Sequence, residues 1–563
     1  MSKMLRVDMT TLKVSMEDSP PEYERLGGRS LIARILNQEV PPTCHPLGKH
    51  NKMIFAPGLF AGSRFPSSGR LSIGFKSPMT QGIKESNVGG TAGEKLGRLG
   101  IKAIILEGQP ADTKLHLIKI NTEGVSILPA NALAGLNNRD TVTKLKEAHG
   151  KDTTVISISN PGEMRMLLAT IADTDTEGRP TRHAARGGPG AVMGSKRIKA
   201  IVIDDSGTKP VKAKDGEAFR NLVKEYANFV TESKGAQAYK VQGTMGGLTF
   251  LSERTTSLPT RNFTAGSFEG ARAIGHRKKV EEMKTQGSRW GVACMPGCLV
   301  CCSNIICDEN GNYITSGLEY ESVAMLGANL GIDDIYAIAN MDALADNYGI
   351  DNIELGVTLG IAVDAGLLEF GDSARAIELI HEIGKGTTLG RILGQGTAIT
   401  AKVFGISRVP VVKGQGVPAH EPRAENVTGV TYCTSAMGAD HTAGLNLERK
   451  ASSTEAIEAS RQAQINVAIV DSLGLCVNSF IDPGFPMERI TALVNAVCGL
   501  NLSYADLQDM GKAMLKEERA FNLKAGFAPG ADRLPEFFKE EPLPPNNFVF
   551  DVPDGEIDSF WDF

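Results

Sequence analysis

The sequence predicts an α+β protein: an N-terminal β-rich base domain followed by two mainly α-helical domains. Three observations predict this class. Short apolar segments between glycine-rich turns fill the chain up to about residue 208, and helical periodicity dominates from Lys214 onward. The length of 563 residues also exceeds what one hydrophobic core supports, so several packed domains are expected.

The N-terminal third reads as a series of short strands. Residues 1–18 alternate apolar and polar side chains, which is typical of a strand and unlike the apolar core of a signal peptide. No apolar stretch is long enough to span a bilayer, so a cytoplasmic location is expected. The remaining predicted strands of this domain are 52–57, 70–75, 103–107, 115–119, 153–158 and 200–203.

The rest of the chain carries helical periodicity. The clearest predicted helices are 219–231, 335–347, 373–383 and 454–473. A second boundary is placed near residues 404–412, where a helical pattern gives way to RVPVVKGQGVP. The predicted domains are therefore 1–208, 209–404 and 405–563.

Charge and cysteine usage narrow the classes of function. The net charge of −5 and the lack of a Lys/Arg block argue against a nucleic-acid partner. With no export signal visible, the nine cysteines are expected in a reducing compartment, where clustered thiols indicate a metal or catalysis more often than disulfides.

Four cysteines lie within the nine residues CMPGCLVCC, 294–302. Iron–sulfur clusters use closely spaced cysteines and a distant fourth. Cys294, Cys298 and Cys302 provide the close set, and Cys476 is the remote candidate. We treat the other lone cysteines as packing residues; they are Cys44, Cys307, Cys433 and Cys498.

Other interpretations of this segment remain open. A structural zinc site is one and a redox disulfide another. A third takes Cys301 in place of Cys302, giving the C-x3-C-x2-C spacing of radical-SAM enzymes. That class needs a surrounding series of βα units, whereas these cysteines are expected between helical stretches.

Two predicted helices end in related turns, DNYGID at 346–351 and DSLGLC at 471–476. A glycine at a helix end adopts the left-handed cap, and an aspartate one turn earlier presents a carboxylate beside it. Asp346 and Asp471 could therefore accept hydrogen bonds from two similar ligands, such as the donor edge of a pterin. An ordinary helix stop is the alternative for each turn alone.

Three segments of the first domain suit phosphate-bearing ligands. They are 67–70 (SSGR), 86–93 (SNVGGTAG) and 182–196 (RHAARGGPGAVMGSK). Their glycines allow backbone N–H groups to converge on phosphate oxygens, and Arg70, Arg182 and Lys196 could supply charge. None matches a P-loop or an intact dinucleotide fingerprint.

Taken together, these motifs resemble the tungsten-containing aldehyde:ferredoxin oxidoreductase family over nearly the full length. The matching segments, in family order, are RLSIGFKSPMTQG, SNVGG, RGGPGAVMGSK, LEYESVAMLGANLGI, DNYGID, DSLGLC and RAFNLKAGF. The resemblance implies a base domain of two β-sheets that carries a tungsten or molybdenum bis-pterin. It also implies two helical domains closing over the cofactor, and a [4Fe-4S] cluster held in part by Cys476.

The resemblance also implies roles for individual residues. Magnesium is expected to bridge the pterin phosphates, partly through carbonyls near Asn87 and His183, and Arg70 is expected between cluster and pterin. The residues expected to hold the pterins are Asp346, Asp471, Gly349, Gly474, Asn87, Gly89, Arg70 and Arg182.

This chain departs from the family pattern in two places. The common C-x2-C-x3-C begins at a position that is Gly291 here, so Cys302 is expected to replace the missing ligand, with Cys301 as the rival. Some members bind iron at a subunit interface through E-x-x-H, but Asn340 and Ala343 stand at those positions. A homodimer, if formed, is therefore expected to lack interfacial iron.

The implied reaction is oxidation of a small aldehyde to a carboxylic acid under anaerobic conditions. Glu321, in GLEYES, is expected to act as general base, and His441, in GADHT, to hydrogen-bond the reacting oxygen. Electrons would pass through the cluster to ferredoxin or a separate iron–sulfur subunit. The alternatives are a low-potential reductase of a carboxylic acid or aromatic thioester, and a non-catalytic electron-transfer subunit.

Overall fold

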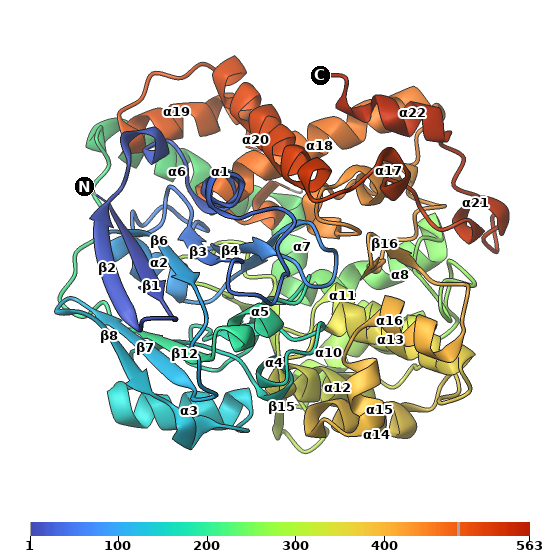
Figure 1. Cartoon of the computed structure of the whole chain (residues 1–563). Helices are drawn as coiled ribbons and strands as arrows, with labels where there is room; N and C mark the ends of the chain where they lie inside the picture. Colours follow the sequence, from blue (N-terminus) through green and yellow to red (C-terminus); the bar gives the residue numbers. More distant parts are fainter. Residues whose placement is uncertain (1, 481–484) are drawn as a thin grey trace.

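The computed structural model describes residues 2–480 and 485–563, and it places two six-stranded mixed β-sheets in the N-terminal third (Figure 1). The first sheet has the order β2-β1-β6-β3-β4-β5 and contains β1 (Lys3–Asp8), β2 (Lys13–Asp18), β3 (Met53–Pro57), β4 (Leu71–Lys76), β5 (Ile83–Val88) and β6 (Ile101–Glu107). The second has the order β11-β10-β9-β12-β7-β8 and contains β7 (His116–Asn121), β8 (Gly124–Pro129), β9 (Thr154–Ser157), β10 (Ile171–Asp173), β11 (Arg182–Ala184) and β12 (Ile198–Ile203).

The two sheets share one apolar core. Phe55 and Ile104 of the first sheet belong to the same buried cluster as Ile118 and Ile201 of the second, and all four are fully buried. Each sheet includes one parallel pair, β1 with β6 and β7 with β12, among otherwise antiparallel neighbours. Short strands buried on both faces explain why their sequences read as continuous apolar runs.

Helices cover the outer faces of both sheets. Helix α1 (Gly28–Glu39) packs on β4 and is itself covered by α18 (Ser453–Leu473) and α20 (Tyr504–Lys524). Helix α3 (Asn138–His149) packs on β9 of the second sheet. The first sheet therefore lies between the second sheet and helices from the far C-terminal part of the chain.

Two groups of helices follow the sheets along the chain, the yellow and the orange to red ribbons of Figure 1. The first group comprises α11 (Tyr320–Leu326), α12 (Ile335–Tyr348), α13 (Asn352–Asp364), α14 (Ser373–Lys385), α15 (Thr388–Leu393) and α16 (Thr397–Phe404). The second comprises α17 (Asn426–Thr434), α18, α19 (Met487–Cys498), α20 and α22 (Asp554–Asp558), with α6 (Gly216–Glu232) packed on α19. The predicted fold class, with two sheets and a mainly helical remainder, is confirmed.

One local prediction is wrong. The cysteine-rich segment does not lie between helical stretches; it connects β13 (Arg289–Val292) and β14 (Ser303–Cys307), two antiparallel strands of a small sheet completed by β15 (Tyr313–Ser316). Strands of four or five residues give little periodicity, and their pairing depends on neighbours. The segment is therefore a loop whose two ends are held together by the pairing of β13 with β14.

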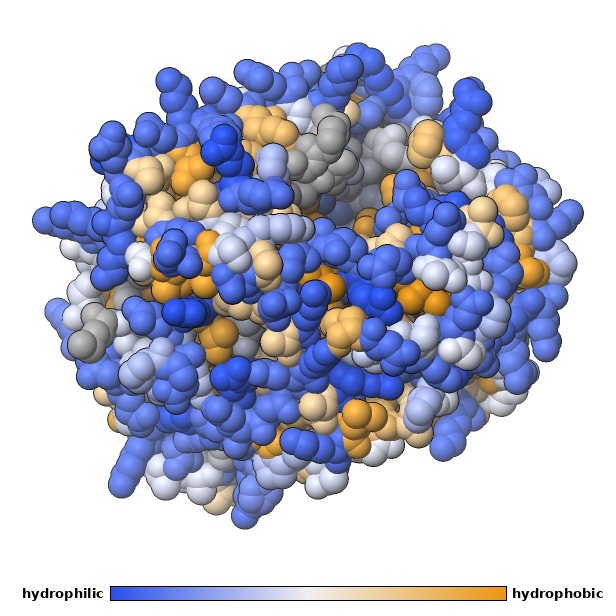
Figure 2. Space-filling model, turned by 90° about the horizontal axis from the view of Figure 1, so that it is seen from above, coloured by the Kyte–Doolittle hydropathy of each residue, from blue (hydrophilic) through white to orange (hydrophobic). Residues whose placement is uncertain are grey.

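The face seen from above is mixed in character. In the view from above, hydrophilic residues surround separate apolar groups, with no continuous apolar band (Figure 2). Within the described ranges, none of the helices combines the length and the apolar character that crossing a membrane requires.

Gly28 lies at a close approach between the base domain and α18. Its φ of +46° is left-handed, and a Cβ atom there would overlap the Asp471 carbonyl oxygen. We expect Gly28→Ala to lower the free energy of unfolding by about 2–5 kcal/mol, because overpacking adds to left-handed strain.

Gly100→Ala is the matched control for that prediction. Gly100 has a φ of +71°, but no heavy atom lies within 4 Å of the place that a Cβ atom would take, so only the strain of about 1–2 kcal/mol should remain. The midpoint of urea unfolding measures both variants. Equal shifts would show that the Asp471 carbonyl moves aside at little cost, and would contradict the prediction.

Candidate active site

Both D-x-x-G turns adopt the predicted geometry. Helix α12 ends at Gly349 with φ 64° and α18 ends at Gly474 with φ 75°, each in the left-handed conformation. The neighbouring chain leaves no room for side chains here, since the Cα atom of Gly58 is 3.0 Å from the position of a Cβ on Gly474. The prediction of paired left-handed caps is confirmed, and both aspartates are buried.

Asp471 belongs to a buried charge network. Its Oδ2 lies 3.3 Å from an Arg29 N–H, and Arg29 donates two further hydrogen bonds, of 2.8 and 3.0 Å, to Glu518. Burial and the nearby Glu85 carboxylate raise the pKa of Asp471 to about 8, and Arg29 opposes that rise. Arg29 therefore orients the Asp471 carboxylate by donating to its Oδ2 atom.

Asp346 has different surroundings. Its Oδ1 lies 3.4 Å from Nε2 of His183, whose pKa burial lowers to about 4. Burial, and then Asp342, raise the pKa of Asp346 well above its usual value. The two D-x-x-G carboxylates thus share backbone geometry, but one faces a guanidinium and the other a neutral imidazole.

Two arginines lie near both a D-x-x-G aspartate and a cysteine of the predicted cluster. Arg70 donates a short hydrogen bond to Asn87 Oδ1, and its charge reaches both the Asp471 carboxylate and the Cys476 thiol. Arg182 donates a 2.8 Å hydrogen bond to Ser303, and its charge acts on Cys294 and Asp346. The charge of each arginine therefore acts on one thiol and on one carboxylate.

Ser67 ties together the two segments that carry the cysteines. Its N–H donates to the Gly297 carbonyl at 3.1 Å, and its Oγ accepts from Leu299 N–H at 3.1 Å. Its carbonyl accepts a 2.9 Å hydrogen bond from the N–H of Cys476. The SSGR loop therefore holds the remote cysteine beside the close set.

The four predicted ligand thiols lie near one another. Cys294 and Cys298 interact directly, and the pKa of Cys294 is raised well above its usual value by that contact and by burial. Cys302 is buried close enough to Cys476 for the two thiolate charges to repel. Among the described residues, however, no three such side chains converge as ligands of a single metal ion do.

Cys301 and Cys302 point to different surroundings. Cys302 accepts a weak 3.6 Å contact from Asn478, two residues after Cys476. Cys301 is half-buried, its thiol donates to the Cys298 carbonyl at 3.2 Å, and Lys240 lies on its other side. Cys302 therefore lies near Cys476, whereas Cys301 contacts Cys298.

The donor set fits the groups that the sequence implies. Thiolates are the ligands that iron–sulfur clusters require, and four come together here from two separated segments. Arg182 Nε is buried without a hydrogen-bond partner, as a group awaiting an anionic ligand would be. A Cβ atom at Gly89 would lie 3.5 Å from the Cys294 sulfur, so the SNVGG loop also borders this region.

A second set of polar groups surrounds Glu321. Its Oε2 accepts a 2.8 Å hydrogen bond from the N–H of Ala419, whereas its Oε1 is buried and accepts no hydrogen bond. His441 Nδ1 lies 3.6 Å from Oε1, beyond hydrogen-bond distance, and it also has no hydrogen-bond partner. Burial lowers the pKa of His441, which favours the neutral imidazole at neutral pH.

The structure separates Glu321 from Glu319. Glu319 accepts a 2.7 Å hydrogen bond from Thr244 and faces Arg182, on the side of the cysteine loop. Glu321 faces the two histidines instead, with a side chain 14% exposed. Glu321, the expected general base, therefore lies beside His441, and Glu319 does not.

Sequence reasoning missed one residue of this set and one of the Asp471 network. His420 places Nε2 3.5 Å from Glu321 Oε1 and Nδ1 3.2 Å from Glu425 Oε2. The only signal was the unusual density of charged residues in HEPRAEN, 420–426, within a buried stretch. Arg29 was missed as well, because its partners lie more than 400 residues away.

One suggested residue lies elsewhere. The sequence suggests Lys196 as a positive charge for a phosphate. Its Nζ donates instead to the carbonyls of Asn51 and Gly108 at 2.6 and 3.2 Å. Burial lowers the pKa of Lys196 to about 7. It therefore stabilises the β base rather than bordering the site.

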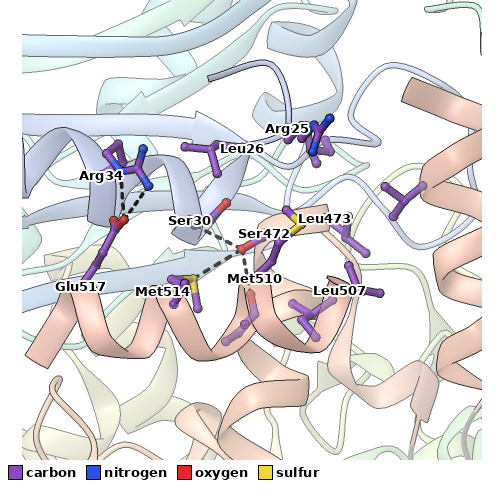
Figure 3. A pocket seen from close by; sticks show the side chains of 16 residues that line it. Arg25, Leu26, Ser30, Arg34, Ser472, Leu473, Leu507, Met510, Met514 and Glu517 are labelled. Atoms are coloured by element: carbon purple, nitrogen blue, oxygen red, sulfur yellow. Dashed lines mark hydrogen bonds and ion pairs between the residues drawn. The ribbon is translucent and has the colours of Figure 1, made fainter. Parts of the chain in front are cut away.

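A mostly apolar cavity of about 120 Å³ lies between α1, α18 and α20 (Figure 3). It contains Ser472, which accepts from Ser30 N–H, and the Arg34–Glu517 ion pair lies at its edge. Neither Glu321 nor His441 lines it. The cavity is thus behind the second D-x-x-G turn and separate from the acid–base groups.

Comparisons with known proteins cover almost the whole chain. Residues 4–205 match the family described as aldehyde ferredoxin oxidoreductase, N-terminal domain, and residues 221–559 match domains 2 and 3 of the same family. The tungsten-containing aldehyde ferredoxin oxidoreductases of Pyrococcus horikoshii and Pyrococcus abyssi are each 32% identical, over 96% of this chain and 92% of their own.

Two further relatives have other names. The WOR-like subunit of an aliphatic sulfonate oxidoreductase from Pyrococcus furiosus is 29% identical over 96% of this chain and 90% of its own. The solved active site complex BamBC of benzoyl coenzyme A reductase matches with a TM-score of 0.81 at 20% identity, over 100% of this chain and 93% of that one. The latter likeness shows a shared fold.

Proposed function

Because the chain belongs to the aldehyde ferredoxin oxidoreductase family, we propose that it oxidises an aldehyde to a carboxylic acid at a tungsten bis-pterin centre. Electrons would leave through a [4Fe-4S] cluster to ferredoxin or a separate iron–sulfur subunit in the cytoplasm. One observation carries the proposal. Glu321 Oε1 and His441 Nδ1 are buried, lie 3.6 Å apart and have no hydrogen-bond partner.

The cofactor would be held by residues of all three predicted domains. Asp346 and Asp471 would accept the pterin donors, with Gly349 and Gly474 allowing close approach. Arg70 and Arg182 would offset the negative charge of the pterin phosphates, and magnesium would bind these phosphates near Asn87 and His183. The cluster ligands would be Cys294, Cys298, Cys302 and Cys476.

Aldehyde oxidation takes one oxygen atom from water and releases two electrons and two protons. When bound, the tungsten centre supplies the Lewis acid and two-electron acceptor that no side chain provides. Glu321 would accept the water proton at Oε1, since Ala419 N–H already occupies Oε2. His441, neutral at neutral pH, would orient the carbonyl oxygen through its ring.

The test uses protein purified anaerobically from a host that makes the cofactor. We expect about one tungsten or molybdenum and about four irons per chain, with aldehyde-dependent reduction of benzyl viologen using acetaldehyde or benzaldehyde. Iron without a group-six metal, and no aldehyde-dependent reduction, would refute the proposal. Running the assay in reverse, from reduced viologen and a carboxylic acid or aromatic thioester, tests the reductase alternative.

A further inference from the structure

We propose that Glu321, His420 and Glu425 form a buried proton relay, in which His420 accepts the proton that Glu321 takes from water. The inference rests on the proposed function and extends it to two residues beyond the expected pair. His420 would act through Glu321, as a positioning and proton-accepting residue.

The geometry is that of one imidazole between two carboxylates. His420 presents Nε2 to Glu321 Oε1 at 3.5 Å and Nδ1 to Glu425 Oε2 at 3.2 Å. The His420 side chain is 5% exposed, and Glu425 is completely buried. Neither oxygen of Glu425 has a hydrogen-bond partner within standard geometry, so His420 is the cationic group available to it.

A buried, unpaired carboxylate is costly, so Glu425 needs a function that offsets its burial. Holding the Nδ1–H of His420 would fix the tautomer that leaves the Nε2 lone pair facing Glu321. An imidazolium formed at His420 would then be stabilised by Glu425, as in hydrolase triads where an aspartate supports the histidine.

The proton step balances without an added reactant. The O–H bond of protonated Glu321 breaks and an N–H bond forms at His420 Nε2, while the Nδ1–H stays on the Glu425 side. Glu321 returns to the carboxylate form and His420 becomes imidazolium. Glu321 is then ready to accept the second proton released by the oxidation.

The groups facing His420 support a raised basicity. Although burial disfavours its charge, Glu425 and Glu321 together raise the pKa of His420. The opposite holds for His441, whose ring lies 6.2 Å away. The other facing groups are Tyr320 of α11, with its ring 5.1 Å away, and Tyr432 of α17, whose hydroxyl donates to the His420 carbonyl at 3.4 Å.

The relay predicts a pH effect with a definite sign. His420 must be neutral to accept a proton, so activity should fall as pH drops through its raised pKa. Glu425→Gln removes the carboxylate that stabilises the imidazolium, so this acid limb should move to lower pH by at least about one unit. The plateau kcat should fall about 10- to 100-fold, the range known for carboxylates that orient metal-bound histidines.

A second measurement does not depend on turnover. In oxidised full-length protein labelled with ¹⁵N-histidine, the ring resonances of His420, assigned by their loss in His420→Gln, should titrate with a midpoint above the ordinary value of about 6.5. Glu425→Gln should lower that midpoint. His381→Gln is the control and should leave the midpoint of His420 unchanged. His381 lies on α14, where it contacts Tyr348 of α12, and not beside His420.

The outcomes are separable. A His420 midpoint at or below the ordinary histidine value, or one that Glu425→Gln leaves in place, would overturn the relay even if the enzyme oxidises aldehydes. A raised midpoint that falls in Glu425→Gln, in a protein that oxidises no aldehyde, would support the coupled pair and reject the reaction. If His420→Gln fails to fold, the shift of the acid limb of the pH–activity profile in Glu425→Gln still decides.

Discussion

Glu321→Gln is expected to lower kcat for aldehyde oxidation by about 10²- to 10⁴-fold, the range for loss of a general base. The amide keeps the shape of the side chain and can still accept from Ala419 N–H, but it cannot take up a proton at the free position. The measurement is the initial rate of aldehyde-dependent viologen reduction in fully metal-loaded protein. KM should change much less than kcat, because the lost interaction forms in the transition state.

Two controls separate chemistry from folding in that experiment. The metal content and the EPR signal of the reduced cluster should be unchanged in Glu321→Gln. Glu382→Gln alters a half-buried glutamate on α14 that accepts from Thr387, and it should leave kcat intact. Wild-type turnover by Glu321→Gln would remove Glu321 from the mechanism.

Much of the fold could be predicted because its signals are local. Helix α18 follows its apolar periodicity closely, from Ser453 to Leu473 against a prediction of 454–473. The left-handed caps at Gly349 and Gly474 follow from the D-x-x-G pattern alone. The domain limits at residues 208 and 404 stay predictions.

The missed residues share a physical cause. Arg29 and Glu518 are 489 positions apart, and His420 meets Glu321 across 99 positions. Such pairs form when distant segments of the chain pack together, and no local pattern records them. The family resemblance supplied Glu321 and His441 but gave no reason to expect a carboxylate on the far side of His420.

The adjacent cysteines at 301 and 302 give the sharpest test of the cluster. Cys302→Ala and Cys476→Ala are each expected to abolish the low-temperature EPR signal of the reduced [4Fe-4S] cluster, because each removes one of four thiolates. Cys301→Ala should retain the signal and the iron, since that half-buried thiol contacts the Cys298 carbonyl rather than Cys476.

Cys301→Ala is the matched control, because it deletes the same atom one residue away. Its own loss could disturb the loop only slightly, whereas Cys302 lies in the buried set beside Asn478. A full signal in Cys302→Ala together with its loss in Cys301→Ala would make Cys301 the ligand. That result would mean that Cys301, which already contacts Cys298, holds the cluster together with Cys476, and that Cys302 is a packing residue.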